Sequence, residues 1–406
     1  MTSGGVMRDD ESIGARIATE RKLRGLTQHR LAGRAHVSLS LLRAVEQGNR
    51  AATATFLAAV AKGLRVHRNV LTGQPYRTGD GSHDAVHDLV AGVRRELAAY
   101  CLPPLSGGDP APLEVLRAEV AEVSALRHAA APYELGVLLP GVLGDLRAAA
   151  YACDGVEREG VMGLWAETYY ATRQWLWQLG YSDLASLTAD RYEWAAARSA
   201  DPLAVALGRV FRAGELSGAG DPHGGRAVMA AAVDSVEPMI GTGDAATTSV
   251  YGFLHLMSAW NAAHTGDTRA TWAHHAEADA AARRIGTDRD HYRLAFGPTN
   301  VGIWGVALAV ETLDGRSAVS RAARVVVPAT APRERAGHHW IDVARAQLLA
   351  GDTVASLDAL RHARRVSPDQ VRAHPLARET VYTLARRERR ASDTLRGLAD
   401  WIGIQD

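Results

Sequence analysis

Gly-Asp turns recur through the second half of the chain at a nearly regular interval. They lie at Gly220-Asp221, Gly266-Asp267, the reversed Asp314-Gly315 and Gly351-Asp352, with a weaker Gly180 before them. The successive spacings are 40, 46, 49 and 36 residues, and helical patterns rich in small, aromatic and alanine residues flank each turn. Helix–turn–helix units that recur every 34–47 residues or so indicate a helical solenoid. Because one such unit cannot bury its apolar face alone, the units stack and leave a concave groove.

The clearest copy of the repeat reads ARAQLLAGDTVASLDALRHARRVSP. It has the small residues, the turn glycine and the closing proline of the tetratricopeptide pattern at Ala344, Gly351, Ser356, Ala363 and Pro368. The region from about residue 165 to 402 therefore resembles tetratricopeptide repeats, although other copies are degenerate. The resemblance implies a superhelix of paired helices and says almost nothing about function. RVVVP at 324–328 is an isolated strand-like fragment, so we expect an all-α protein.

Charge is distributed unevenly along the chain. Residues 13–68 contain eleven Lys and Arg residues but only two acidic ones, Glu20 and Glu46. Of the 46 basic and 45 acidic residues in the whole chain, this leaves 35 basic and 43 acidic residues elsewhere. A net charge of +1 therefore hides a basic head on an acidic body. Such an asymmetry indicates a nucleic-acid partner, because phosphate attracts only the basic part.

The basic head contains two short apolar patterns in residues 26–48, LTQHRLAGRAHVSLSLLRAVEQG. Thr27 is a good N-cap for a helix that carries Leu31, Ala32 and Ala35 on its buried side. Small residues at this place let a second helix cross at a tight angle. That crossing is what a helix-turn-helix motif needs.

The second pattern predicts a helix with one inward and one outward side. Ser38 is its N-cap, Leu42 and Val45 face inward, and Gly48 ends it as a left-handed C-cap. The side left facing outward carries Leu39, Ser40, Arg43 and Ala44. In a helix-turn-helix motif, that side reads base edges in the major groove.

The whole segment from Ile13 to Val66 resembles the Xre/Cro family of phage-repressor-like helix-turn-helix domains. The likeness extends through TFLAAVAKGLRV, which matches the fourth helix of that family. It implies a lambda-repressor-like fold that binds double-stranded DNA. Two residues depart from the family pattern. His36 stands where a glycine is usual in the turn, and Leu39 is apolar at a base-reading position, where it can touch a thymine methyl group.

The resemblance also implies roles for single residues. Gln28 binds a phosphate, the start and outer side of the third helix read bases, and Arg21 pairs with Glu46 as a structural ion pair. Including the cap and a phosphate-attracting arginine, we expect DNA contacts from Thr27, Gln28, Ser38, Leu39, Ser40, Arg43, Ala44 and Arg50. The alternative for Arg43 is a solvated surface arginine.

The concave side of the repeats is the candidate ligand groove. The first helix of each pair lines this side in tetratricopeptide-like solenoids, and here those helices carry aromatic, amide and arginine side chains that suit an extended ligand. The residues singled out are Tyr251, Asn261, Asn300, Trp304 and Arg345. Asn300 and Trp304 are four residues apart and share a helical face. The alternative is that such aromatic residues form the core between repeats.

Other classes of chemistry have little support in the sequence. His83 and His87 are four residues apart, but two ligands do not make a metal site, so we expect neither a metal nor a cofactor. The chain has no GxGxxG after a strand, no GxxxxGKS/T and no GxSxG, which argues against an enzyme. The N-terminus lacks an apolar signal core, and the longest apolar run is about half a membrane span. We therefore expect a cytoplasmic protein that does not associate with membranes.

These inferences divide the chain into a disordered lead-in at 1–11, a helix-turn-helix domain at 12–73, a linker at 74–83, a helical connecting region at 84–164 and a tetratricopeptide-like domain at 165–406. They predict a sequence-specific transcriptional regulator whose repeats form a homodimer and sense a small-molecule or peptide effector. High-GC bacterial regulators and, more distantly, Rgg/PlcR-type peptide receptors resemble this arrangement. Two alternatives stay open. One is a constitutive DNA binder that uses its repeats only to dimerise, and the other is an interaction scaffold with a vestigial head.

Overall fold

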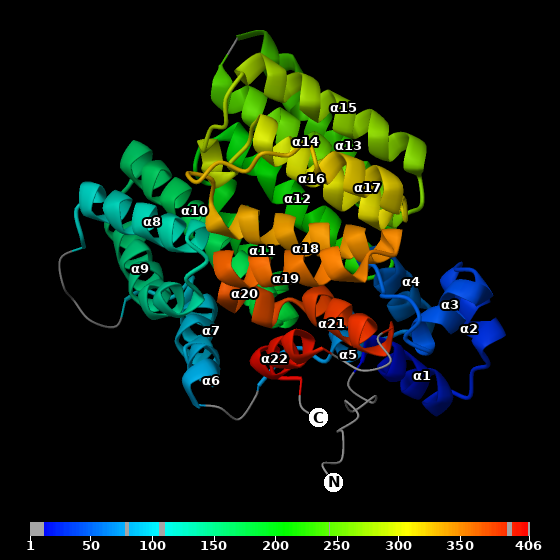
Figure 1. Cartoon of the computed structure of the whole chain (residues 1–406). Coiled ribbons are helices and arrows are strands. Elements are labelled where there is room, and N and C mark those ends of the chain that lie inside the picture. Colours follow the sequence, from blue (N-terminus) through cyan, green and yellow to red (C-terminus); the bar gives the residue numbers. More distant parts are fainter. Residues whose placement is uncertain (1–11, 78–80, 105–109, 243, 388–391, 405–406) are drawn as a thin grey trace.

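A computed structural model describes residues 12–77, 81–104, 110–242, 244–387 and 392–404 (Figure 1). The expected lead-in at 1–11 lies outside these residues. The described residues form helices joined by turns, and their only β-type contact is an isolated bridge between Arg289 and Phe296. The all-α fold class is thereby confirmed.

The head consists of five short helices: α1 (Ile13–Leu23), α2 (Gln28–Ala35), α3 (Leu39–Glu46), α4 (Ala54–Leu64) and α5 (Arg68–Thr72). The first four begin where a hydroxyl side chain caps the helix, at Ser12, Thr27, Ser38 and Thr53. His36 ends α2 with a left-handed φ of 53°, in the turn where the Xre/Cro pattern has glycine. The core of the head includes Ile17, Leu31, Leu42, Val45 and Val60, each 0% exposed.

Four helices connect the head to the repeats: α6 (Gly81–Asp88), α7 (Val90–Ala99), α8 (Leu113–His128) and α9 (Pro132–Ala152). Helix α6 begins inside the expected linker, and its His87 hydrogen-bonds the Tyr76 carbonyl, so the described part of that linker is held in place. Helix α9 is long and apolar enough to cross a membrane by length and composition alone. It packs against α7, α8 and α10, and a core helix passes the same test.

Five pairs of helices follow, and each pair packs closely along its length. They are α10 (Gly155–Leu179) with α11 (Ser182–Ala196), α12 (Pro202–Gly218) with α13 (Pro222–Val236), α14 (Ala245–His264) with α15 (Thr268–Ile285), α16 (Pro298–Glu311) with α17 (Gly315–Ala322), and α18 (Arg333–Ala350) with α19 (Thr353–Val366). Two short 3₁₀ turns lie between pairs, at Glu237–Thr242 and His291–Arg293. The boundary expected between residues 164 and 165 falls inside α10, because that helix runs on without a break.

The Gly-Asp turns join the two helices of a pair, and the glycine and the aspartate of each turn have different roles. In the third pair, Gly266 takes a left-handed φ of 75°, and Asp267 then caps α15 by accepting from the Ala270 amide. Glycine adopts this φ without the strain that a Cβ brings, and aspartate is a preferred N-cap. The reversed turn differs. Asp314 caps α17, but Leu313 occupies the left-handed position, at φ 62°.

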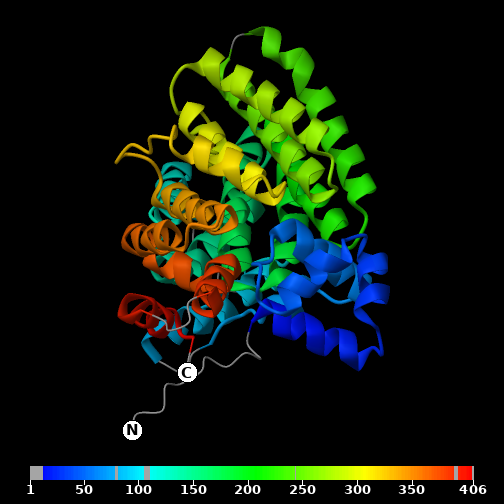
Figure 2. The same ribbon diagram turned by 45° about the vertical axis from the view of Figure 1, so that its right-hand side comes forward.

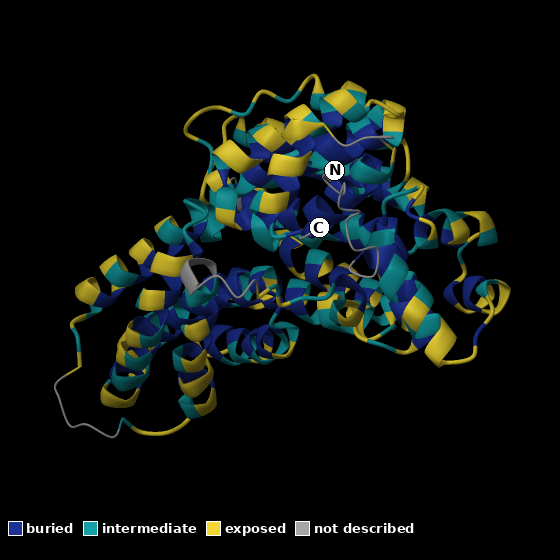
Figure 3. Cartoon of the chain, turned by 60° about the horizontal axis from the view of Figure 1, so that its bottom comes forward, coloured by how far each residue is buried: buried dark blue, intermediate teal, exposed yellow. Residues whose placement is uncertain are grey.

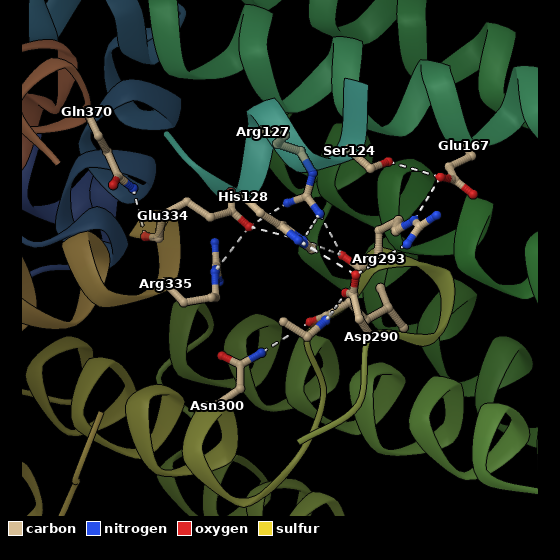
Figure 4. A network of polar contacts seen from close by, with 12 residues as sticks. Ser124, Arg127, His128, Glu167, Asp290, Arg293, Asn300, Glu334, Arg335 and Gln370 are labelled. Carbon is tan, nitrogen blue, oxygen red and sulfur yellow. Dashed lines mark hydrogen bonds and ion pairs between the residues drawn. The ribbon is translucent and has the colours of Figure 1, made fainter. Parts of the chain in front are cut away.

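The end of the chain returns to the start of the body. Helices α20 (Pro368–Ala373), α21 (Pro375–Arg387) and α22 (Asp393–Ile402) complete the fold, and the beginning of α18 meets α8. A buried ion pair closes this contact, with Arg127 of α8 2.5 Å from Glu334 of α18 (Figure 4). Arg127 also donates to the Arg293 carbonyl at 2.7 Å. The body from α8 to α18 is therefore bent into an arc whose two ends touch.

The body caps the first turn of α4. The amides of Ala54 and Thr55 donate to the Glu311 carboxylate at the end of α16, over 3.3 and 2.8 Å, and the Thr55 hydroxyl donates to it over 2.9 Å. Glu311 is 3% exposed, and its carboxylate lies 2.6 Å from Arg345 of α18. Burial acts to raise the pKa of Glu311, but the charges of Arg345 and His264 and the hydrogen bonds from Arg345 and Thr55 together outweigh it and hold the pKa below its usual value. The carboxylate therefore stays ionised at a helix start, where negative charge is favourable.

The first turn of α1 also contacts a carboxyl group of the body, Glu379 of α21. The Ile13 amide donates to its carboxylate over 3.2 Å, and burial raises the pKa of Glu379 to about 7. On the other side of the head, Asn69 of α5 donates to the Gly180 carbonyl in the first repeat turn, over 2.6 Å. The head thus contacts the body from the first helix pair to the last helices (Figure 2). We call this set of contacts the seat of the head.

Candidate nucleic-acid interface

Helices α2 and α3 lie at the edge of the molecule, away from the repeats (Figure 1). Leu42 and Val45 of α3 point into the head and are 0% exposed. The opposite side of α3 reaches solvent. Throughout the chain, helices are exposed on their outer sides and buried on their inner sides (Figure 3). It presents exposed Ser38, Ser40 and Arg43 together with half-buried Leu39. Ala44, which was also expected on this side, instead lines a cavity between the head and the body. A helix with its polar side free at the edge of a domain can enter a major groove.

A connected set of polar side chains holds α1, α2 and α3 together beneath this face. Both oxygens of Glu46 accept from Arg21, over 2.7 and 2.9 Å, and Arg21 also donates to the Leu26 carbonyl. Gln28 donates to the same carboxylate over 2.7 Å, and its own oxygen lies 3.4 Å from Nε of Arg43. The hydrogen bond with Glu46 raises the pKa of Arg21. Burial is nearly complete at Glu46, whose side chain is 4% exposed, so the pair belongs to the interior of the head.

Gln28 links the interior to the surface. Its amide is fixed by Glu46 on one side and restrains Arg43 on the other, so the Arg43 guanidinium starts from a defined place at the outer side of α3. The hydroxyl of the neighbouring Thr27 caps α2 by accepting from the Arg30 amide, over 3.2 Å. Preorganised donors of this kind lose less entropy on binding than free side chains do.

Basic side chains surround the reading helix. Lys22, Arg30 and Arg34 are exposed, and Arg50 is half-buried after the end of α3. Arg24 is also exposed, but its side chain is bonded to the head itself, donating to the Leu64 carbonyl over 2.9 Å and pairing with Glu20. The exposed cations can serve phosphates on either side of a groove without reading the sequence.

The structure places Asn300 and Trp304 on α16, one turn apart. Asn300 is 3% exposed and donates to the Leu294 carbonyl over 3.3 Å, while its Oδ1 has no partner among the described residues. Trp304 is half-buried and stands edge-on to Trp260, with ring centres 5.5 Å apart. Asn300 therefore faces the loop that precedes its own helix, and Trp304 faces the neighbouring pair.

The three other groove candidates have separate surroundings. Tyr251 lies edge-on to His255 within α14, with ring centres 4.5 Å apart. Asn261 is 7% exposed, with its Oδ1 unpaired among the described residues. Arg345 is 7% exposed and bonded to both Glu311 and Asp342. The guanidinium of Arg345 therefore supports the seat of the head. In the described part of the chain, no three His, Cys, Asp or Glu side chains gather as a metal site would require.

The two seat carboxylates, Glu311 and Glu379, were not among the residues singled out from the sequence. A faint signal exists for one of them, because Glu311 ends the otherwise apolar run VGIWGVALAVE. A lone acid at the end of an apolar helix needs a partner when it is buried. The sequence does not identify that partner, since Thr55 lies 256 residues away.

Comparison with known proteins agrees with the geometry of the head. Residues 12–72 match the model of a family described as a helix-turn-helix domain. No curated protein and no solved structure matches the chain. The match covers α1 to α5 and none of the repeats. The head is therefore a helix-turn-helix domain of the kind that DNA-binding regulators use.

Proposed function

We propose that the protein is a cytoplasmic, sequence-specific transcriptional regulator of the Xre/Cro type, with tetratricopeptide-like repeats. The observation that carries the proposal is the outer side of α3, where Ser38, Ser40 and Arg43 are exposed over a buried polar network. Serine and arginine at the start and middle of a recognition helix are able to bond base edges. The surrounding cations supply the attraction to phosphate that brings the helix to the groove.

The body adds dimerisation and effector sensing to this function. With 43 acidic and 35 basic residues outside 13–68, the rest of the chain carries a net negative charge as a whole, so the basic head is the part that DNA attracts. A single helix-turn-helix head reads one half-site, so two heads about 34 Å apart are needed for a full operator. The repeats supply the surface for that dimer. They also bind a small-molecule or peptide effector, and this binding regulates the head.

Genome-wide footprinting of the full-length protein tests this function directly. We expect a limited set of protected sites with two related half-sites about one helical turn apart. Competition with random DNA should leave those sites occupied. Uniform, weak protection that disappears at moderate salt would instead indicate non-specific phosphate binding.

Light scattering on the full chain tests the dimer.

A second candidate function is a constitutive regulator that uses the repeats only to dimerise. It is favoured by the packing of Trp304 on Trp260 and by the ion pairs of Arg345 with Glu311 and Asp342. Operator affinity measured in cell extract and after extensive dialysis separates the two candidates. A sensor changes its affinity when the effector is removed, whereas a constitutive binder does not.

A further inference from the structure

A cavity that is open to solvent lies in the seat of the head. It has a volume of about 360 Å³ and lies between the connection from α3 to α4 on one side and α16 and α18 on the other. Its walls include Ala51 and Thr53 of the head and Val310, Leu349 and Arg345 of the body. Pockets for small molecules begin at about 300 Å³, so this cavity admits a small organic molecule and is too small for a folded partner.

The chemistry of the walls selects the guest. Aliphatic side chains such as Leu313, Leu348 and Leu349 make much of the surface apolar. Arg50 and Arg387 add two guanidinium groups, and neither is paired with a carboxylate among the described residues. Among the described residues, Arg387 donates only to the carbonyls of Leu348 and Asn49. An apolar guest with one anionic group satisfies both features, since guanidinium binds carboxylate with directed hydrogen bonds.

A strained residue borders the cavity. Leu313 holds a left-handed φ of 62° where the corresponding residues, Gly266 and Gly351, are glycines, and its side chain is 37% exposed beside the cavity. A non-glycine residue in this region is strained, and such strain clusters at ligand sites. Leucine at this position adds an aliphatic side chain to the apolar wall of the cavity, which glycine would not.

We propose that this cavity is a binding site for a small organic monoanion with an apolar body, and that its guest holds the head in its seat. This inference rests on the proposed function as an effector-controlled regulator. Because the two walls come from head and body, the complete site exists only while the head is seated. A guest therefore stabilises the seated state by mass action, and that state has one fixed orientation of α3 relative to the repeats.

The probe for this site is 1-naphthoate, with uncharged 1-naphthamide as its isosteric counterpart. Calorimetry on the full-length protein should show naphthoate binding at least tenfold tighter than naphthamide. Leu349→Trp fills the cavity and should weaken both probes tenfold or more. Val354→Trp, at a 72% exposed position on α19 outside the cavity, is the matched control and should bind both normally.

A second variant tests the charge. Arg387→Gln should weaken naphthoate at least fivefold and leave naphthamide unchanged. Hydrogen exchange provides the readout for the seat, because bound naphthoate should slow exchange of the amides at the start of α4 in the wild type and in Val354→Trp. Equal binding of the two probes, equal binding by Leu349→Trp, or unchanged exchange in α4 would each overturn the proposal. The footprinting experiment fails or succeeds independently of these measurements, so loss of DNA specificity would overturn the proposed function while leaving the cavity result readable.

Discussion

The head has two sides that are stabilised in different ways. The side that carries α2 and α3 has its buried carboxylate, Glu46, bonded within the head, to Arg21 and Gln28. The side that carries the first turns of α1 and α4 depends on the body, whose carboxylates Glu379 and Glu311 cap those helices. The reading surface is therefore built locally, whereas the orientation of that surface is determined by residues about 250 to 370 positions away.

This difference separates two jobs within one small domain. Changes in the body can shift how the head is held without altering the contacts that position Arg43. Changes in the network of Arg21, Gln28 and Glu46 alter the reading helix without touching the seat. Perturbing each side in turn shows whether the separation holds.

Mild acid should produce the largest effect, and it should act on the body. Burial lowers the pKa of His338 to about 3 and of His255 and His339 to about 4. Groups whose pKa is lowered on folding contribute stability above their unfolded pKa of about 6.5, and this contribution is lost as the pH falls toward the folded value. At pH 5 each of the three histidines should lower the free energy of unfolding by about 2 kcal/mol. Urea denaturation at pH 7 and pH 5 measures this loss, and an unchanged free energy of unfolding would contradict it.

Glu311→Ala should be the most damaging single substitution in the seat. It strands buried Arg345 and uncaps α4, so we expect a loss near the upper end for a broken buried pair, about 5 kcal/mol of unfolding free energy. Thermal and urea unfolding of the full chain measure it. Glu311→Gln, which keeps the shape of the side chain and loses its charge, is the control. Its free energy of unfolding should lie between those of the wild type and Glu311→Ala. If hydrogen exchange in α4 stays as slow as in the wild type, the body does not hold this side of the head.

Glu46→Ala should act on the other side and cost less, about 3 kcal/mol. The remaining Arg21 is 11% exposed and keeps its bond to the Leu26 carbonyl, which moderates the penalty. Exchange should accelerate in α2 and α3 while the start of α4 stays protected. Acceleration in α4 as well would mean that the two sides are not independent.

Arg43→Ala should give the smallest effect, confined to DNA. Removing a side chain from the exposed side of α3 should leave the melting temperature unchanged and weaken operator binding by about 1–3 kcal/mol. Gel-shift titrations on operator and random DNA of equal length measure it. Arg34→Ala, an exposed cation on α2, is the control and should weaken both DNAs alike. Equal losses for Arg43→Ala would make Arg43 a phosphate contact.

What could be predicted from the sequence follows from distance along the chain. The repeat turns are local: Gly266 and Asp267 are adjacent, and each acts on its own turn. The caps of the head at Thr27 and Ser38 are equally local, as three-residue patterns. The Arg21–Glu46 contact, 25 residues apart, came from resemblance to a family and not from spacing.

The seat could not be predicted, because its partners lie hundreds of residues apart and follow no period. Asn300 illustrates a second limit. Its spacing from Trp304 places both on one helical face, but the loop before α16 folds back, and the Leu294 carbonyl accepts from the Asn300 amide. Helical periodicity shows which side a residue is on, and it does not show what covers that side.

The capping of α1 by Glu379 also has a consequence during synthesis. The head leaves the ribosome more than 300 residues before Glu379 and about 250 residues before Glu311. At roughly 5–20 residues per second, the newborn domain waits on the order of 15 to 70 seconds for its second cap. During that time it can fold around Glu46 and meet DNA with no orientation imposed on it. Glu311 and Glu379 can hold the head only after they have been translated, so residues late in the sequence fix the orientation of a domain that is made early.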